Sequence, residues 1–247
     1  MTKSYTVPEP AAAPSRAPHR PRRPRPVAPG HRVRMEPGER VNMILDSAVA
    51  FFAEHGFDAQ THDLARTLSV SQSLIYHYFS TKDELVERVY QRTFLSRWRG
   101  SWTALLADRG IPLAPRLKRF YASYFRVIDD SNWVRIFMFS GLGGSNFAKR
   151  YIDNQINGVL RLIAAEINAE FDPAAPESQP SDTDIELVWH LHSTFIHHLV
   201  RKYIFRTATL IDMERLIDVT VDDYLAGAAA RFGHTQGVAP TAVSGAR

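Results

Sequence analysis

The sequence predicts an all-α protein. Apolar residues recur at the 3.6-residue spacing of an amphipathic helix over most of residues 37–232, and helix-capping residues stand at the ends of these stretches. No stretch alternates apolar and polar residues in the manner of a strand, and no internal repeat is present. With 247 residues, of which 45% are hydrophobic, the chain is long enough for one large domain or two small ones.

The composition excludes several classes of protein. The chain contains no cysteine, so it has no disulfide framework and no thiolate metal site. No apolar run approaches the roughly 18 residues that a membrane helix needs, and the N-terminus lacks the apolar core of a signal peptide. We therefore expect a cytoplasmic protein that does not contact membranes.

Residues 1–36 are rich in Pro, Arg and Ala, and we expect a disordered arm there because proline at this density prevents helix formation. Residues 1–34 carry eight Lys or Arg and one Glu, a net charge of +7, so the rest of the chain carries −3 of the total of +4. The favoured interpretation is a solvated tail, and Met35 could itself begin a complete domain. The alternative is an arm that adds non-specific affinity for phosphate, for instance from a minor groove.

The first helix is predicted to begin at Pro37, because proline suits the first turn of a helix. Apolar residues then recur at helical spacing from Val41 to Phe52. Gly56 is expected to end this helix, since glycine readily takes the conformation of a helix C-terminus.

Capping residues mark three further helices. Thr61 and Ser71 are the expected N-caps of the second and third helices. Thr81 and Glu84 have the spacing of a capping box. They predict a long fourth helix that continues toward Asp108.

The second and third helices have the pattern of a helix-turn-helix. Leu74, Ile75 and Phe79 would bury the inner face of the third helix. Its outer face keeps hydrogen-bonding and aromatic groups with no carboxylate among them, namely Gln72, Ser73, Tyr76, His77 and Tyr78. Such a face suits the DNA major groove, where base edges present donors, acceptors and methyl groups. Residues 37–92 together carry −3, but no acidic residue lies between Leu64 and Lys82.

This segment resembles the DNA-binding domain of the TetR family of bacterial transcriptional regulators. The matching positions, in the family's order and spacing over about a fifth of the chain, are Ile44, Leu45, Ala48, Phe51, Phe52, Gly56, Thr61, Leu64, Ala65, Val70, Ser71, Ile75, Tyr76, Tyr78, Phe79, Lys82 and Leu85. One position departs from the pattern, because Ser69 stands where the family usually has a glycine. Serine adopts the left-handed conformation of a helix end at some energetic cost.

The resemblance implies a set of DNA-contacting residues. Those implied for base edges are Gln72, Ser73 and His77, and a glutamine can make a bidentate contact to adenine. Those implied for phosphates are Thr61, Tyr76, Tyr78 and Lys82. His62 and Ser71, near the starts of the two helices, complete the predicted set. The alternative is an ordinary short surface helix.

Beyond Gly110 the sequence predicts only helices, at about 112–129, 133–140, 145–171, 182–205 and 211–232, for about nine in the whole chain. By resemblance, these form a helical ligand-binding and dimerisation domain. The predicted divisions are a Pro/Arg-rich arm (1–36), the helix-turn-helix DNA-binding domain (37–84), the effector-binding and dimerisation domain (85–232) and a disordered tail (233–247).

The C-terminal part is dense in aromatic residues, most of which are expected in the core. The resemblance implies an apolar pocket among them that binds a small-molecule effector of unknown identity. The residues predicted to line it are Trp102, Tyr121, Phe125, Trp133, Phe137, Phe147, Tyr151 and His192.

Four histidines lie in the predicted helix 182–205, namely His190, His192, His197 and His198. Two metal ligands on one helix face need a spacing of three or four residues, and no flanking carboxylate completes a site. A polar dimer face or pocket wall is therefore favoured over a metal site. We expect no cofactor, no metal and no catalysis, because no Ser/His/Asp or paired-carboxylate set has a recognisable context.

The resemblance implies a homodimer formed through the last two helices, whose apolar positions are Leu187, Leu191, Phe195, Leu199, Leu216, Val219 and Leu225. The expected function is that of a TetR-like repressor that binds double-stranded operator DNA and is released by an effector, with the helix after Thr81 transmitting the change. Two alternatives remain, a ligand- or metal-binding enzyme on a helical scaffold, and an interaction module that retains the helix-turn-helix as a scaffold.

Overall fold

In the computed structural model, residues 36–143, 145–172 and 179–237 are described, with side chains described as far as Gly233. All described helices belong to one compact unit that begins at Glu36. The predicted arm, apart from Glu36, lies outside the described residues. Every regular element that is described is helical, which confirms the all-α prediction.

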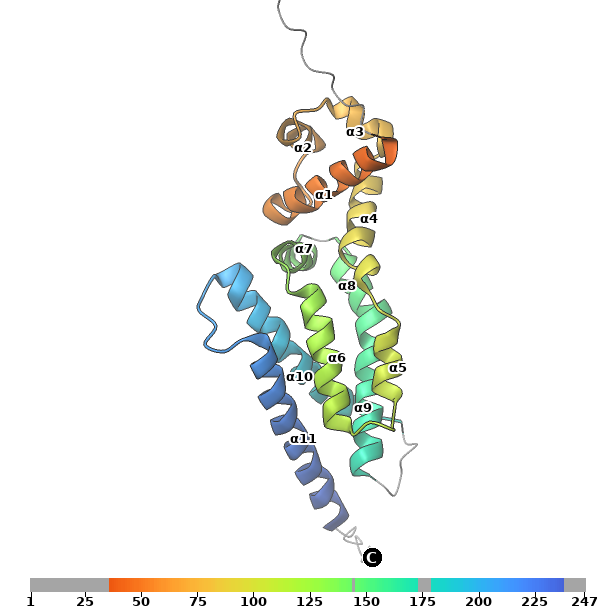
Figure 1. Ribbon diagram of the computed structural model, residues 1–247, viewed down its shortest axis with the longest axis vertical. Coiled ribbons are helices and arrows are strands. Elements are labelled where there is room, and N and C mark those ends of the chain that lie inside the picture. The colour runs from red at the N-terminus through yellow and green to blue at the C-terminus, as the bar shows by residue number, and fades with distance from the viewer. Residues whose placement is uncertain (1–35, 144, 173–178, 238–247) are drawn as a thin grey trace, which may run out of the picture. The chain divides into compact units, whose positions relative to one another are not determined.

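The described helices appear in chain order in Figure 1. They are α1 (Pro37–His55), α2 (Thr61–Thr67), α3 (Gln72–Tyr78), α4 (Lys82–Thr93), α5 (Ser101–Ala107), α6 (Leu113–Ile128), α7 (Ser131–Leu142), α8 (Phe147–Tyr151), α9 (Asn157–Phe171), α10 (Asp182–Val200) and α11 (Met213–Gly237). A short 3₁₀ turn lies at Leu95–Arg97, and π-helical turns follow α8 at Ile152–Ile156 and α10 at Arg201–Phe205.

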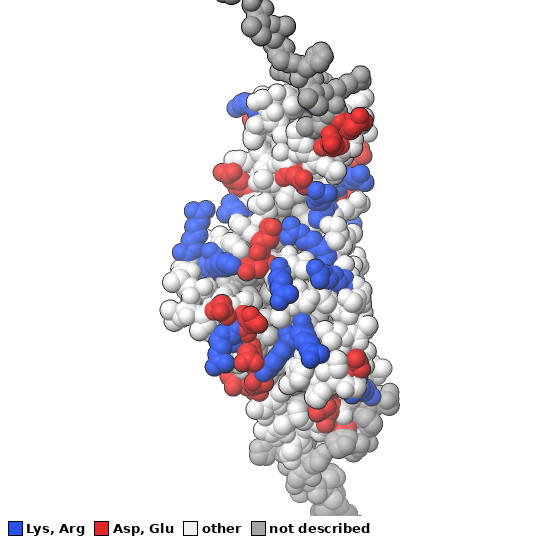
Figure 2. All heavy atoms as spheres, in the orientation of Figure 1, with Lys and Arg blue, Asp and Glu red and all other residues white. Residues whose placement is uncertain are grey.

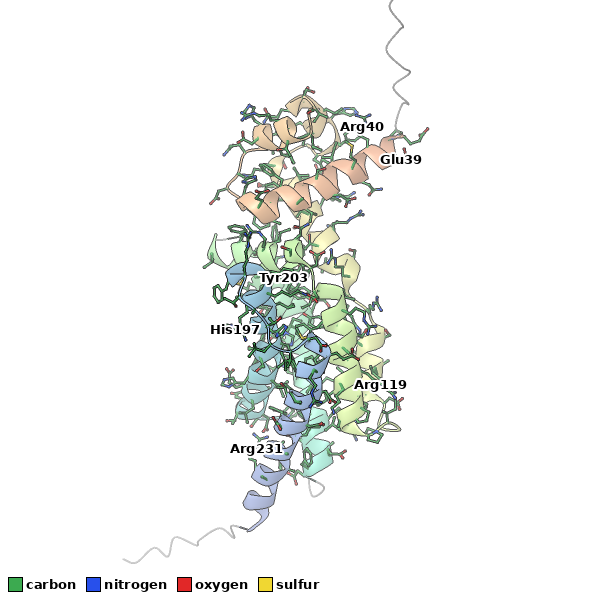
Figure 3. All side chains as sticks on the ribbon, turned by 60° about the vertical axis from the view of Figure 1, so that its left-hand side comes forward. Glu39, Arg40, Arg119, His197, Tyr203 and Arg231 are labelled. Atoms are coloured by element: carbon green, nitrogen blue, oxygen red, sulfur yellow. The ribbon has the colours of Figure 1, made fainter. Side chains whose placement is uncertain are left out.

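Helix α1 begins and ends where its sequence predicts. Glu36 and Glu39 form a reciprocal capping box around Pro37, which occupies the first turn. Figure 3 labels Glu39 in this turn. Gly56 ends the helix with φ of 76° and ψ of 175°, a conformation that is almost restricted to glycine. Ile44 and Phe52 are fully buried on the inner side of α1.

The turn between α2 and α3 contains the strained residue that the sequence indicated. Ser69 has a φ of 53°, in the left-handed region. The backbone N–H of Val70 donates to the carbonyl of Ala65, and that of Ser69 donates to Arg66, so the turn closes as a helix C-terminus does. The departure from glycine therefore leaves the turn intact with local strain.

We expect Ser69→Gly to stabilise the protein by about 0.5–1 kcal/mol, because glycine adopts a positive φ without the Cβ penalty but loses more entropy on folding. Urea unfolding of both proteins measures this difference. An unchanged or lower midpoint would show that Ser69 is not under strain.

Two predicted caps differ in detail. Gln60, and not Thr61, is the N-cap of α2, and Thr61 is the first helical residue. The Thr81 hydroxyl accepts from the backbone N–H of Glu84 and so caps α4, as predicted. The carboxylate of Glu84 accepts from the backbone N–H of Ser80, so the second bond of the predicted capping box is displaced by one residue.

The prediction of one long helix from Thr81 toward Asp108 was wrong. Helix α4 ends at Thr93, and the chain turns at Trp98, whose ψ is 135°, before α5 begins at Ser101. Arg97 holds this break, since its guanidinium donates to the Val127 carbonyl and lies 3.4 Å from an Asp130 carboxylate oxygen. Val127 and Asp130 are 30 and 33 residues away from Arg97 in the sequence, so local periodicity does not indicate the break.

The remaining helices form one bundle. Helix α6 packs against α5, α9 and α11, and α10 packs against α9 and α11. The predicted helix 145–171 is divided into α8, a π-helical turn and α9. Helix α11 continues to Gly237, so the prediction that a disordered tail begins at residue 233 was wrong.

Helix α1 is joined to the bundle mainly through α7. The Arg135 guanidinium donates to the backbone carbonyls of Ala53 and Glu54 in the last turn of α1. A positive charge there also complements the negative end of the helix dipole. Beside it, the Phe139 ring lies so close to Gly56 that a Cβ at that glycine would meet it at 3.3 Å.

A second connection to the bundle uses α4 and α8. Arg150 makes a bidentate ion pair with Glu87, with N–O distances of 2.7 and 3.1 Å, and its guanidinium lies 4.4 Å from the centre of the Tyr90 ring. The hydrogen bond from Arg150 is the main reason that the pKa of Glu87 is lowered. None of the helices in the described ranges combines the length and the apolar character that crossing a membrane requires.

Candidate nucleic-acid interface and aromatic core

Helix α3 carries a polar outer side on a buried apolar base. Ile75 is fully buried and belongs to the same apolar cluster as Leu64 of α2. The Ser71 hydroxyl accepts from the backbone N–H of Leu74 at 3.2 Å and so caps the helix. The outer side exposes Gln72, Ser73, Tyr76 and His77, as the sequence predicts.

A buried threonine ties two of these exposed side chains to α2. Thr61 is only 3% exposed. The Gln72 amide donates to the Thr61 hydroxyl at 2.9 Å, and the Tyr76 hydroxyl shares a hydrogen bond with the same oxygen, also at 2.9 Å. The Thr61 hydroxyl is thus used inside the domain, which differs from the phosphate contact implied by the resemblance. Its effect is to hold the two helices and two outer side chains in one arrangement.

The charged groups of α2 form a small cluster of their own. Asp63 forms an ion pair with Arg66 at 3.4 Å, and its carboxylate lies 3.2 Å from a ring nitrogen of His62. His62 therefore lies beside a carboxylate, which reduces the electrostatic attraction of this corner for phosphate. Figure 2 shows that most basic side chains on that face of the molecule lie over the C-terminal helices and not over α2 and α3.

The other predicted DNA-binding residues lie along one side of α3 and at the start of α4. His77 is exposed and its ring packs edge-on against the ring of Tyr78, which is half-buried. Lys82 is the first residue of α4 and is half-buried. The geometry offers amide, hydroxyl and imidazole groups to a groove, with few positive charges, so recognition there would depend on base edges more than on bulk charge.

The residues predicted to line an effector pocket belong to one connected set of aromatic contacts in the bundle. Seven of the eight are buried and Phe137 is half-buried. Trp133 stacks on Phe137 with ring centres 5.2 Å apart, and also contacts Tyr151. A cleft between α6 and α11 has one member of this set, Phe125, in its wall. The effector pocket therefore stays a prediction, and its predicted lining is closely packed.

The polar groups inside this core are uncharged at neutral pH. Burial lowers the pKa of His192 to about 4, so its imidazole is neutral. Burial, with a smaller contribution from nearby Tyr224, raises the pKa of Tyr121 far above its usual value. The hydroxyls of Tyr124 and Tyr151 share a hydrogen bond at 3.2 Å, and burial raises the pKa of both.

The histidines of α10 face different surroundings. His192 is enclosed by aromatic rings, whereas His190, His197 and His198 line a cleft of about 1070 Å³ beside the α10–α11 connection. Figure 3 labels His197 on α10. Within the described part of the chain, no three His, Cys, Asp or Glu side chains are placed to hold a metal ion.

Of the seven apolar positions predicted for a dimer face, four are buried, and Leu187, Leu216 and Val219 are half-buried. Leu191, Phe195 and Leu199 of α10 and Leu225 of α11 are buried within their own subunit, so intramolecular packing accounts for them. Three apolar side chains are exposed at the α10–α11 connection, where Phe205, Leu210 and Ile211 are 59%, 92% and 42% exposed; Leu142, at the end of α7, is 82% exposed.

Sequence reasoning missed the residues that join the helix-turn-helix to the bundle. Arg135 contacts α1 across more than 80 positions of sequence, and Arg150 contacts Glu87 across 63. No capping signal or local spacing marks such contacts.

Helices α2 and α3 and the turn between them form a helix-turn-helix. Residues 44–89 match the sequence profile of the bacterial regulatory proteins of the tetR family. This segment, about a fifth of the chain, is therefore similar to the DNA-binding domain of the TetR family of transcriptional regulators.

Relatives support this assignment. The HTH-type transcriptional repressor KstR2 of Mycolicibacterium smegmatis is 31% identical over 90 residues, which cover 36% of this chain and 43% of that protein. The crystal structure of Mycobacterium smegmatis AmtR is similar at a TM-score of 0.54 and 21% identity, over 85% of this chain and 99% of that chain. A tetR-family regulator from Streptomyces coelicolor is similar at 0.52 and 21% identity, over 82% and 87%. At these identities the two structures show the fold alone.

Proposed function

We propose that this protein is a repressor that binds operator DNA as a homodimer and is released by a small-molecule effector. The observation that carries the proposal is the outer side of α3, where Gln72, Ser73, Tyr76 and His77 are exposed together on a rigid apolar base. A short helix of this kind fits the major groove, and its amide and imidazole groups match base edges. KstR2, one of the similar proteins, is a transcriptional repressor, and this similarity supports repression over activation.

The internal hydrogen bonds suggest a role for each group in the interface. Gln72 and Tyr76 are held by Thr61, so they meet DNA in a preset orientation and lose little side-chain entropy on binding. His77 and Ser73 are exposed and would face base edges, and the Ser73 hydroxyl also shares a hydrogen bond with that of Ser71 at 2.9 Å. We assign the positioning role to Thr61, and the phosphate contacts to Tyr76, Tyr78 and Lys82.

A dimer is proposed because one such helix reads only a short half-site. The exposed apolar side chains of the α10–α11 connection, Phe205, Leu210 and Ile211, adjoin the large cleft of α10, and a second copy would remove them from water. A protein that binds bacterial chromosomal DNA works in the cytoplasm, where we place it.

The test is binding of the full chain to duplex DNA from upstream of its own gene, compared with a scrambled duplex over a salt series. We expect a preference of about a thousandfold or more that persists at physiological salt. Equal binding to both duplexes that collapses with salt would contradict sequence-specific regulation. No DNA binding, together with a stable protein partner, would support the interaction-module alternative.

His77→Ala provides the residue-level test. We expect it to weaken binding to the operator by about tenfold or more, because one base contact contributes about 1–3 kcal/mol. The stability should not change, since His77 is exposed. His55→Ala is the matched control, because His55 is an exposed histidine at the C-terminal end of α1 and lies outside the helix-turn-helix. Equal affinities of the two variants for the operator would refute the placement of α3 in the groove.

A further inference from the structure

His192 is a buried imidazole surrounded by aromatic rings. It is 4% exposed, and its ring centre lies 5.7–6.1 Å from those of Tyr121, Tyr124, Phe125 and Trp189. Its Nδ1 atom is buried and has no hydrogen-bond partner. A buried polar atom without a partner is unfavourable, and such atoms are uncommon in folded proteins.

Tyr121, next to His192, has the same property. It is fully buried, and its hydroxyl has no hydrogen-bond partner. The hydroxyl of Tyr124, one turn along α6, is by contrast paired with Tyr151. The Tyr121 hydroxyl on α6 and the His192 Nδ1 atom on α10 therefore lie on neighbouring rings, and neither has a hydrogen-bond partner among the described residues.

A surface cleft lies beside these rings. The cleft between α6 and α11 has a volume of about 300 Å³, and Phe125, which contacts His192, lies in its wall. Because Phe125 contacts both the cleft and His192, binding at the unpaired groups would require this side chain to move. The rim carries Asp129, Asp212 and Glu214 against Arg126, so its charge disfavours an anion.

The interior of the site also disfavours a charged ligand. The buried charges of the bundle, Arg116 and Glu166, are paired with each other. The groups around His192 are phenol, indole and hydrocarbon rings, and a charge placed among them would lose its hydration without an ionic partner. Apolar and aromatic surface, by contrast, is well matched to such a lining.

We propose that the α6–α11 cleft and the Tyr121–His192 pair form a binding site for an uncharged, largely apolar ring compound that carries a hydroxyl or carbonyl group. The ring would pack among the aromatic side chains, and its polar group would satisfy the Tyr121 hydroxyl and His192 Nδ1. The identification of this ligand as the effector rests on the proposed regulatory function. The binding of the ligand does not depend on that function.

The first measurement is the thermal stability of the protein without ligand. Tyr124→Phe removes a paired hydroxyl and leaves that of Tyr151 unpaired, so we expect the Tm to fall by about 3 °C or more. Tyr121→Phe removes a hydroxyl that has no partner, so we expect the Tm to stay within about 1 °C or to rise. An equal fall in both variants would show that Tyr121 is already paired and would overturn the proposal.

The second measurement is calorimetric titration of the full chain with the β-isomers of naphthol, methylnaphthalene and naphthoate, which have similar size but differ in polarity and charge. We expect naphthol to bind most tightly and naphthoate most weakly. Tyr121→Phe and His192→Phe should each weaken naphthol binding about tenfold and leave methylnaphthalene binding unchanged. Tyr90→Phe is the matched control, because Tyr90 also has a buried, unpaired hydroxyl but contacts Phe94 and Phe147 instead.

Tighter binding of naphthoate, equal loss in the Tyr90 variant, or no saturable binding of any of the three compounds would overturn the proposal. These titrations contain no DNA, so their failure is separate from failure of the proposed function. Conversely, naphthol binding that leaves the operator affinity unchanged would retain the site and remove its role as an effector site.

Discussion

Glu166→Ala should destabilise the protein by about 3–5 kcal/mol, because it leaves a buried guanidinium without its counter-ion. The side chains of Arg116 and Glu166 are 3% and 7% exposed, and they are joined by an N–O distance of 2.7 Å. Arg116 also donates to the carbonyl of Leu106, at the end of α5. Arg109 donates to both oxygens of the same carboxylate at 3.1–3.3 Å. One carboxylate on α9 thus holds the end of α5, the α5–α6 connection and α6 together.

Urea unfolding at neutral pH measures this loss, and Glu170→Ala is its matched control. Glu170 lies one turn further along α9 and is exposed, so its replacement should change the stability by no more than about 0.5 kcal/mol. A loss below about 1 kcal/mol for Glu166→Ala would mean that water replaces the carboxylate at Arg116.

The same carboxylate predicts a dependence on pH. Burial raises the pKa of Glu166, but the hydrogen bonds and charges of Arg109 and Arg116 outweigh burial and hold the pKa below its ordinary value of 4.5. A carboxyl whose pKa is lowered by folding stabilises the fold above its unfolded pKa, and this contribution is lost as the pH falls through the folded value. The stability advantage over Glu166→Gln should therefore be complete at neutral pH and should shrink below pH 4.5.

Gly56→Ala is expected to destabilise the protein by about 2–3 kcal/mol. The φ of 76° and ψ of 175° at Gly56 disfavour any residue with a Cβ, and the new methyl group would press on the Phe139 ring at 3.3 Å. Both effects act at the contact between α1 and α7, which lies between the DNA-binding helices and the bundle. The operator affinity should therefore fall together with the stability.

Gly38→Ala is the control for this prediction, and equilibrium unfolding is again the measurement. Gly38 lies in the first turn of α1, its φ is not positive, and an added Cβ meets nothing within 4 Å. Alanine favours the helix there by about 0.5–1 kcal/mol, so the control should be as stable as the original protein or more so. If both variants lost stability equally, the α1–α7 contact would not be the cause.

Much of the helix-turn-helix is determined by local sequence. Pro37 and Gly56 mark α1, Ser71 caps α3, and Thr81 caps α4, because each of these signals depends on backbone groups within a few residues. The strained turn at Ser69 was predicted from the resemblance, because the family usually has a glycine at this position. The all-α class follows from the same short-range periodicity.

What the sequence could not indicate depends on contacts between distant segments. Arg97 breaks the predicted long helix by bonding to Val127 and Asp130. Leu191, Phe195 and Leu199 of α10 are buried in their own bundle, where residues of α6, α9 and α11 contact this helix. Periodicity reports that a helix has an apolar face, but it does not report which neighbour covers that face.

The functional sites divide in the same way. The composition of the outer side of α3 determined the candidate DNA-binding residues, since an exposed helix face is a local property. That Thr61 is buried beneath Gln72 and Tyr76, that Arg135 caps α1 from α7, and that Tyr121 and His192 lack partners were decided by tertiary structure. Whether a polar group is paired depends on which side chains the whole fold brings within hydrogen-bonding distance, and that is not a property of any short segment.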